Sequence, residues 1–291
     1  FFTKSDTRTV ASLFAEHTFK VGDLTTTLGA MGLHNSVFGW KAYSGADFSY
    51  RLNDELTAFA SVNQSNRLPS FTDIYYSDRA TKGNPDLVPE QSISAEIGVK
   101  MSSGAVNCSV SGFARAIDNM IDYVYNSSDS LFHAANLAAM NVYGTEATVN
   151  FLPKQQWGER CPVASVSVGY SYNFAEKAAE NLTTRYSMDF LKHKATLAIA
   201  HELAWGVAAS WNFSLQKRNG AFDEAVEKVL TGQKKNFDTI LLTNLQLAYK
   251  FANYEITCSA QNLFDVRYFD YGNVELPGRV LKIELSAGFG I

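Results

Sequence analysis

The chain has 291 residues, of which 46% are hydrophobic and 13% aromatic, and its formal net charge is −4. A helical membrane protein is excluded because no run of about 18 apolar residues occurs, and the acidic balance argues against a nucleic-acid-binding protein. The three cysteines and five histidines have no metal-ligand or disulfide-framework spacing, so we expect neither a metal nor a cofactor.

Segments in which apolar and polar side chains alternate recur along the chain. They are residues 7–20, 40–52, 56–63, 91–101, 164–174, 205–216 and 281–291. The clearest is residues 91–101. Its odd-numbered positions from Ile93 onward, such as Ile97, are apolar, and its even-numbered positions, such as Ser92 and Glu96, are mostly polar. Successive side chains of a strand point to opposite faces, so these are two-faced strands. A run of about ten residues is long for a soluble strand and suits a tilted crossing of a bilayer.

Connections between the strands alternate between two kinds. The short ones are residues 21–23, 53–55, 102–104, 204–206 and 252–253. The long ones are residues 66–89, 125–135, 175–188, 218–237 and 265–278. Two connections are exceptions to the alternation: residues 33–39 are short for the long set, and residues 153–162 are long for the short set. Short turns at one end and long loops at the other are typical of an outer-membrane barrel. We therefore predict an all-β, antiparallel up-and-down transmembrane β-barrel, here a partial barrel of about 13 strands.

A soluble β-sandwich or propeller is the alternative interpretation of the same alternation. Such a fold would bury the apolar row of each strand against a second layer. In a membrane barrel the apolar row instead faces lipid, and the polar row, with charged residues such as Lys41, Glu96 and Glu284, faces a wet or plugged interior. Aromatic residues at strand ends, such as Trp205 and Tyr249, favour the membrane interpretation because aromatic rings prefer the interface.

Three sequence stretches resemble the C-terminal barrel region of TonB-dependent outer-membrane receptors. They are "RLPSFTDIYY…GNPDLVPEQS" at residues 67–92, "NVYGTEATV" at 141–149 and "AQNLFDVRYFDYGNVELPGRVLKIELS" at 260–286. The resemblance implies that residues 1–291 are the C-terminal portion of a receptor β-barrel in the bacterial outer membrane. A family barrel has about 22 strands and a plugged lumen, so we expect the plug and the earlier strands outside this chain. Alone, residues 1–291 are not expected to close a barrel, because their first strand would be an unpaired edge.

Residues within these motifs also have roles that follow from their chemistry. Pro85 and Pro89 cannot donate to a β-ladder, so they keep the loop extended until strand pairing starts at Gln91. Asn262 and Asp265 are expected to cap a strand end by bonding nearby backbone groups. These are structural roles, and none is catalytic.

The function implied by the resemblance is TonB-energised uptake of a scarce nutrient, with a ferric siderophore or similar metal chelate preferred. Cobalamin, haem or glycan uptake by the same mechanism, or a passive porin-like channel, remain as alternatives. An enzyme is not expected, since no nucleophile with a base and an orienting group stands out. The implied partners are outer-membrane lipid, the TonB complex through a plug domain absent from this chain, and a small-molecule nutrient ligand, with no nucleic acid.

Substrate contacts are expected on the long connections that carry aromatic and charged side chains. The candidates are Phe71, Tyr75, Tyr76, Asp78, Arg79, Tyr125, Phe132, His133, Tyr268, Phe269 and Tyr271. For any one of these aromatics, packing within the loop or a place at the membrane interface is the alternative interpretation.

Overall fold

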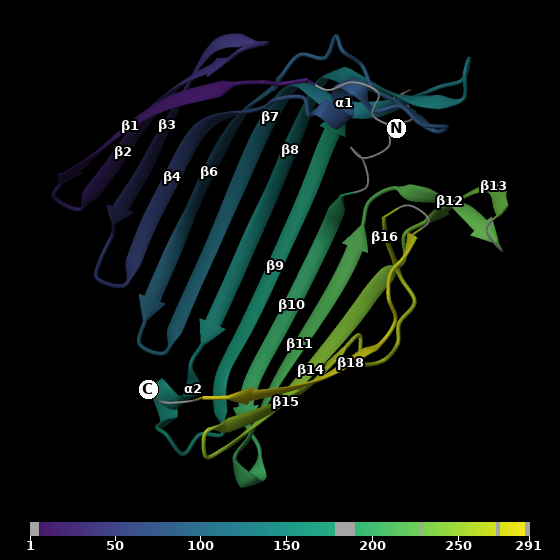
Figure 1. Ribbon diagram of the computed structural model, residues 1–291. Coiled ribbons are helices and arrows are strands. Elements are labelled where there is room, and N and C mark those ends of the chain that lie inside the picture. Colours follow the sequence, from purple (N-terminus) through teal and green to yellow (C-terminus); the bar gives the residue numbers. More distant parts are fainter. Residues whose placement is uncertain (1–5, 178–189, 227–228, 272–273, 289–291) are drawn as a thin grey trace. The chain divides into compact units, whose positions relative to one another are not determined.

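The computed structural model describes residues 6–177, 190–226, 229–271 and 274–288, and these are mostly antiparallel strands (Figure 1). Short helical turns lie in the connections, as α1 (Phe71–Tyr75), α2 (Pro153–Trp157) and the 3₁₀ turn Ala204–Gly206. In the described ranges no helix has the length and apolar character needed to span a membrane.

One sheet contains thirteen strands that follow one another in chain order, and a fourteenth, β5 (Thr81–Lys82), that pairs with β8 from the side. The thirteen are β1 (Val10–Val21), β2 (Leu24–Asn35), β3 (Gly39–Arg51), β4 (Leu56–Arg67), β6 (Glu90–Ser103), β7 (Val106–Asn126), β8 (Leu131–Phe151), β9 (Val163–Lys177), β10 (Leu191–Glu202), β11 (Val207–Arg218), β14 (Thr239–Phe251), β15 (Tyr254–Gln261) and β18 (Val280–Ala287). In the described residues this sheet is open, with β1 and β18 as its ends. The predicted strand number is confirmed.

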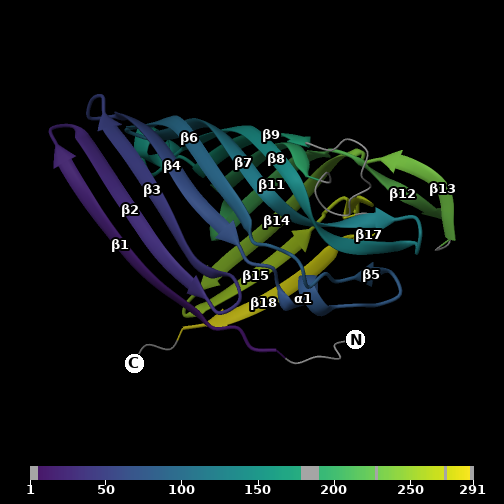
Figure 2. The same cartoon turned by 90° about the horizontal axis from the view of Figure 1, so that it is seen from above.

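Two further strand pairs lie outside this sheet. They are β12 (Ala221–Val226) with β13 (Val229–Asn236), and β16 (Phe269–Tyr271) with β17 (Val274–Glu275). The β12–β13 hairpin projects beyond the ends of β11 and β14 (Figures 1 and 2). The contacts within the chain divide into two compact units, which we describe separately. The first takes the described parts of Phe1–Val99, Ser111–Thr145 and Phe174–Met188, and the second takes the rest.

In the first unit, strands β1 to β4 pair antiparallel in continuous register, and β6 follows beside β4 (Figure 1). On β6 the apolar row is the exposed one: Ile93 is 51% and Ile97 69% exposed, whereas Ser92 and Glu96 are half-buried. A soluble sandwich would show the opposite pattern, because it would bury the apolar row against a second layer. The exposed apolar row instead agrees with a surface that contacts lipid.

In the second unit, exposed aromatic rings gather at the end of the strands that carries the short turns. Trp205 lies in the turn between β10 and β11 and is 90% exposed. Tyr249, Phe251 and Tyr254 form a stacked series with ring centroids 6.0 and 5.4 Å apart. Val207, which follows the Trp205 turn, pairs with Tyr249, so the turn and Tyr249 lie at the same end of two adjacent strands. Their grouping at the strand ends is typical of an interfacial aromatic girdle.

Asn262 and Asp265 bond the backbone as predicted. The Asn262 side chain accepts from the Val266 N–H at 2.9 Å and donates to the Val266 carbonyl at 2.8 Å. Asp265 Oδ1 accepts from the Arg279 N–H at 2.7 Å, which fixes the entry into β18. A Cβ at Gly278 would meet the Asp265 carboxylate, so a side chain here would displace the group that accepts from the Arg279 N–H.

The connections correct several expectations. Residues 125–135 are not a long loop, because β7 continues to Asn126 and β8 begins at Leu131. The aromatic residues there favour extended backbone, and β5 gives the start of β8 an additional partner. Residues 218–237, 66–89 and 265–278 also contain strands or a helix rather than only loop. Most of the predicted loop 175–188 lies outside the described residues.

Candidate functional site

The predicted aromatic loop of the first unit begins with helix α1, whose start is fixed by a capping box. Ser70 Oγ accepts from the Asp73 N–H at 3.1 Å, and Asp73 Oδ2 accepts from the Ser70 N–H at 2.9 Å. Each side chain thus satisfies a backbone donor of the other residue. Asp73 is only 5% exposed, so this carboxylate lies inside the loop rather than on its surface.

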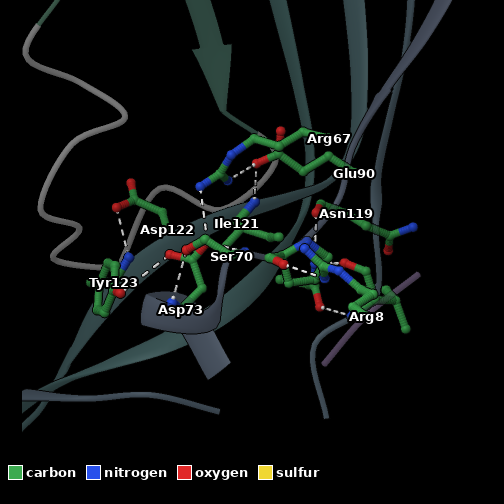
Figure 3. A network of polar contacts seen from close by, with 12 residues as sticks. Arg8, Arg67, Ser70, Asp73, Glu90, Asn119, Ile121, Asp122 and Tyr123 are labelled. Carbon is green, nitrogen blue, oxygen red and sulfur yellow. Dashed lines mark hydrogen bonds and ion pairs between the residues drawn. The ribbon is translucent and has the colours of Figure 1, made fainter. Parts of the chain in front are cut away.

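A network of charged groups joins α1 to the neighbouring strands (Figure 3). The Arg67 guanidinium bonds Asp73 Oδ2 at 3.1 Å and Glu90 Oε1 at 2.8 Å. Glu90 Oε1 also accepts from the Ile121 N–H at 2.6 Å, and Tyr123 Oη donates to Asp73 Oδ1 at 3.2 Å. The end of β4, helix α1, the start of β6 and β7 are therefore held by one connected set of charge-assisted bonds, which we call the α1 clamp.

The rest of the motif, from Gly83 to Val88, packs tightly against α1, β7 and β8. A Cβ at Gly83 would lie 2.8 Å from the Ile74 carbonyl group, so the chain passes α1 too closely for any side chain. Leu87 lies in a small core with Ile121, Tyr123 and Ala134. The Asn136 side chain bonds both the N–H and the carbonyl of Val88, each at 2.9 Å. The motif residues between Arg67 and Glu90 thus build a rigid platform.

The first group of predicted contact residues, from Phe71 to Arg79, lies on α1 and the segment that follows it. Phe71 and Tyr75 stack with ring centroids 6.2 Å apart, and Tyr75 Oη donates to Asp6 Oδ2 at 2.6 Å. The Arg8 guanidinium lies over the Phe71 ring, 5.1 Å from its centroid, and donates to the Pro69 carbonyl at 2.7 Å. The segment before β1 is therefore attached to α1.

Asp78 has a structural role within the same loop. Its carboxylate accepts from the N–H groups of Ala80 at 2.9 Å and Thr81 at 2.7 Å, and from Tyr76 Oη at 3.0 Å. These bonds fix the turn that leads into β5. Arg79, in contrast, is exposed.

Strand β5 brings the first and second groups of predicted residues together. It pairs parallel with β8, placing Thr81 opposite Phe132 and Lys82 opposite His133. Tyr125 contacts Phe132 edge-to-face at 5.4 Å. These three predicted residues, Tyr125, Phe132 and His133, lie on strands and not on the loop that was expected, because the β7–β8 hairpin is longer than predicted.

His133 bonds the Asp129 carboxylate at the tip of this hairpin, with 2.7 Å between Nε2 and Oδ2. This hydrogen bond is the main cause that lowers the pKa of Asp129, and the Leu131 N–H adds to it. The tip is therefore fixed by a side-chain pair four residues apart.

The third group of predicted residues lies in the second unit, at a cavity of about 320 Å³. Tyr268 and Phe269 line this cavity together with Phe222 and Phe237 from the β12–β13 segment. The Phe222 ring lies 5.0 Å from Phe237 and 5.1 Å from Phe269, measured between centroids. The remaining lining residues are Lys235, Asp238, Ile240 and Arg267. The Tyr271 side chain lies outside the described part of the chain.

Known proteins with the same sequence pattern identify the family. The family described as "TonB dependent receptor-like, beta-barrel" matches residues 1–263. The chain belongs to the TonB-dependent receptor β-barrel family. This confirms the resemblance that the three motifs indicated.

Individual relatives are distant and longer than this chain. The vitamin B12 transporter BtuB of Photobacterium profundum is 23% identical over 225 residues, which cover 76% of this chain and 33% of that protein. The siderophore receptor PirA of Acinetobacter baumannii has a TM-score of 0.73 at 16% identity, over 99% of this chain and 47% of that one. The copper transporter OprC has a TM-score of 0.69 at 14% identity, over 96% and 48%. The structural likeness supports the fold, while the three names differ in cargo.

The first family motif gives the α1 clamp through Arg67, Asp73 and Glu90, in the same segment as the candidate contact residues Phe71, Tyr75, Tyr76, Asp78 and Arg79. Sequence reasoning missed Phe222, Phe237 and Lys235, because they lie in a stretch read as loop. The signal that could have found them is the alternation in "AFDEAV" and the aromatic residue that closes "KKNF". In the described ranges no group of three His, Cys, Asp or Glu side chains could hold a metal ion.

Proposed function

We propose that this chain is the C-terminal portion of the barrel of an outer-membrane receptor that imports a scarce nutrient with TonB energy. The observation that carries the proposal is the family match over residues 1–263, on a sheet whose apolar rows are exposed. Exposed apolar rows suit strands that contact acyl chains, while the polar rows suit an interior that holds water or a plug. The TonB complex would act through that plug.

Strand β1 would be paired by another strand of the complete barrel. An unpaired strand edge is costly in hydrocarbon, because each unsatisfied backbone group there costs several kcal/mol. The same reasoning holds for β18 at the other end of the strand order. Residues 1–291 therefore act as part of a larger closed sheet.

The cargo we propose first is a ferric siderophore or similar metal chelate. This is supported by the siderophore receptor PirA and the copper transporter OprC among the similar structures. Cobalamin is the second candidate, because the sequence relative BtuB is a vitamin B12 transporter. Haem and glycans are further candidate cargoes for the same mechanism.

Two surfaces are proposed to contact the cargo. One is the α1–β5 segment with the β7–β8 hairpin, which carries Phe71, Tyr75, Tyr76, Asp78, Arg79, Tyr125, Phe132 and His133. The other is the cavity that Tyr268 and Phe269 line, with Tyr271 next to it in the sequence. The first surface combines the long connection between β4 and β6 with the end of the β7–β8 hairpin, and the second lies on the long connections that follow β11 and β15. These ends of the strands would lie outside the cell.

Uptake measurements in cells test the proposal. A strain that lacks the gene, and the same strain complemented with it, would be supplied with radiolabelled ferric chelates, haem and cobalamin. We expect one cargo class to be lost in the deletion strain and restored by complementation. Inactivation of TonB should abolish the restored uptake, whereas a passive porin-like channel would retain it. Equal uptake of all three cargo classes with and without the gene would contradict the proposal for these cargoes.

A further inference from the structure

The cavity of the second unit has aromatic walls that strand register holds in place. Phe222 and Lys235 are directly paired across the β12–β13 hairpin, so the phenyl ring and the lysine side chain lie on the same face of the hairpin. Phe269 is paired with Glu275 across β16 and β17. The Phe222 and Phe269 rings stack with 27° between their planes. These contacts preorganise the cavity walls.

Positive charge surrounds this cavity although the whole chain carries a net charge of −4. Lys235 and Arg267 line the cavity. Behind its wall, Lys217 Nζ bonds the Phe237 carbonyl at 2.9 Å, and the Arg218 guanidinium lies 5.9 Å from the Phe237 ring centroid. Among the described side chains here, the carboxylates are Asp238 on the lining and Glu275.

Glu275 also fixes the direction of the Arg267 guanidinium. It accepts two bonds from Arg267, at 2.7 and 2.9 Å, in a bidentate pair. This pair lowers the pKa of Glu275, chiefly through the hydrogen bond. The pair orders the Arg267 side chain, but Glu275 offsets much of its charge, so the attraction for an anion at the cavity lining falls chiefly to Lys235.

We propose that this cavity binds a planar, anionic aromatic group of the transported ligand. Stacked rings offer their faces to another flat ring, and the surrounding cations attract its charge. An apolar cavity of about 150 Å³ can hold a benzene molecule. The cavity here, at about 320 Å³, has room for a substituted ring with its anionic group.

Packing alone does not account for the arrangement. Phe222 and Phe237 are buried, but Tyr268 and Phe269 remain half-buried beside the cavity, so part of each ring is accessible to a ligand. The inference that this cavity binds an aromatic anion rests on the proposed function, in which the cavity contacts the cargo.

Binding of 4-fluorobenzoate to the complete protein, purified in detergent, tests the inference. The fluorine NMR shift would be titrated and then competed with benzoate, cyclohexanecarboxylate, benzyl alcohol and inorganic phosphate. Benzoate should compete best, with the saturated acid about two- to tenfold weaker, because aromatic pairing adds modestly to area burial. Equal competition by benzyl alcohol would reveal an apolar hole, and equal competition by phosphate a mere anion site; either result would overturn the inference.

Variants place the binding event in the cavity. Lys235→Gln should weaken 4-fluorobenzoate binding about three- to fivefold, as expected for an exposed charge pair, and Lys235→Arg should restore it. Phe269→Leu should weaken benzoate but not cyclohexanecarboxylate. Lys20→Gln, on an exposed lysine of β1, is the matched control and should change nothing. Unchanged binding in both cavity variants would overturn the inference.

The measurement separates this inference from the proposed function. It uses purified protein without TonB or transport, so the cavity can fail while TonB-dependent uptake persists. Conversely, a receptor without TonB-dependent uptake could still bind the aromatic anion.

Discussion

The α1 clamp and the aromatic cavity are two loop regions built on opposite principles. The clamp is held by charge: Asp73 and Glu90 receive bonds from Arg67, Ser70, Tyr123 and a backbone N–H, and both carboxylates are largely inaccessible. The cavity is held by ring packing and leaves cations and open space at its surface. The region of the first motif is therefore chiefly a structural device, whereas the cavity region, which includes part of the third motif, is the better candidate for selecting cargo.

Removal of the Asp73 carboxylate gives the largest expected effect. Asp73→Ala leaves Arg67, the Ser70 N–H and Tyr123 without their shared acceptor. Loss of one partner from a buried charged network costs about 3 kcal/mol or more of unfolding free energy. Chemical unfolding in detergent would measure it, with Asp86→Ala as control because Asp86 lies exposed in the same loop. Equal stability of the two variants would show that the clamp contributes nothing.

Phe237→Ala is the corresponding test for the cavity region. Phe237 is only 2% exposed and contacts Phe222, so truncation leaves a void costing locally about 3 kcal/mol. The hairpin should open while the main sheet persists, so trypsin should cut faster after Lys234 and Lys235. Phe264→Ala, on a residue 68% exposed in the same unit, should leave cleavage unchanged. Cooperative loss of the whole sheet in Phe237→Ala would contradict a locally stabilised region.

Gly83→Ala tests how tightly the clamp is packed. The new Cβ would meet the Ile74 backbone at 2.8 Å, and backbone cannot move aside as a flexible side chain can. Overpacking of this kind costs about 1–3 kcal/mol, a smaller effect than loss of the carboxylate. Gly32→Ala, where nothing lies within 4 Å of the added atom, is the matched control in chemical unfolding. If both alanines are tolerated equally, the loop has more freedom than the contact implies.

The same contrast explains what could be predicted from the sequence. The strands and most turns follow from local alternation at period two, as on β6, and from turn residues, so the strand number and the caps at Asn262 and Asp265 were predictable. The α1 clamp was not, because the bonds between Arg67, Asp73 and Glu90 join residues that only the fold brings together. The capping box of Ser70 and Asp73 was readable but starts a helix of only five residues.

Among the predicted contact residues, the residue type alone did not distinguish side chains that could contact a ligand from side chains that stabilise the loop. Asp78 has the composition of a ligand-binding residue, yet its carboxylate fixes a turn. Phe222 and Phe237 were missed because their stretch was read as loop. The alternation in "AFDEAV" could have indicated the hairpin, but not the contact of Phe222 with Phe269 of β16, which only the fold creates. Tyr268 and Phe269 could be named as candidates because they lie on a long connection within the third motif.

The smallest expected effect is a pH dependence confined to the cavity region. Arg267 lowers the pKa of Glu275 below its ordinary value of 4.5. A carboxyl group with a lowered pKa stabilises the folded form above its unfolded pKa, and the contribution is lost as pH falls through the lowered value. The β16–β17 pair should therefore stay protected from hydrogen exchange from neutral pH down to about 4.5 and lose protection below it. Because both side chains are exposed, the change should be slight and should weaken further in high salt. Glu275→Gln should remove the pH dependence of exchange in β16–β17 and leave exchange in α1 unaltered. A transition that persists in Glu275→Gln would show that the Arg267–Glu275 pair is not its cause.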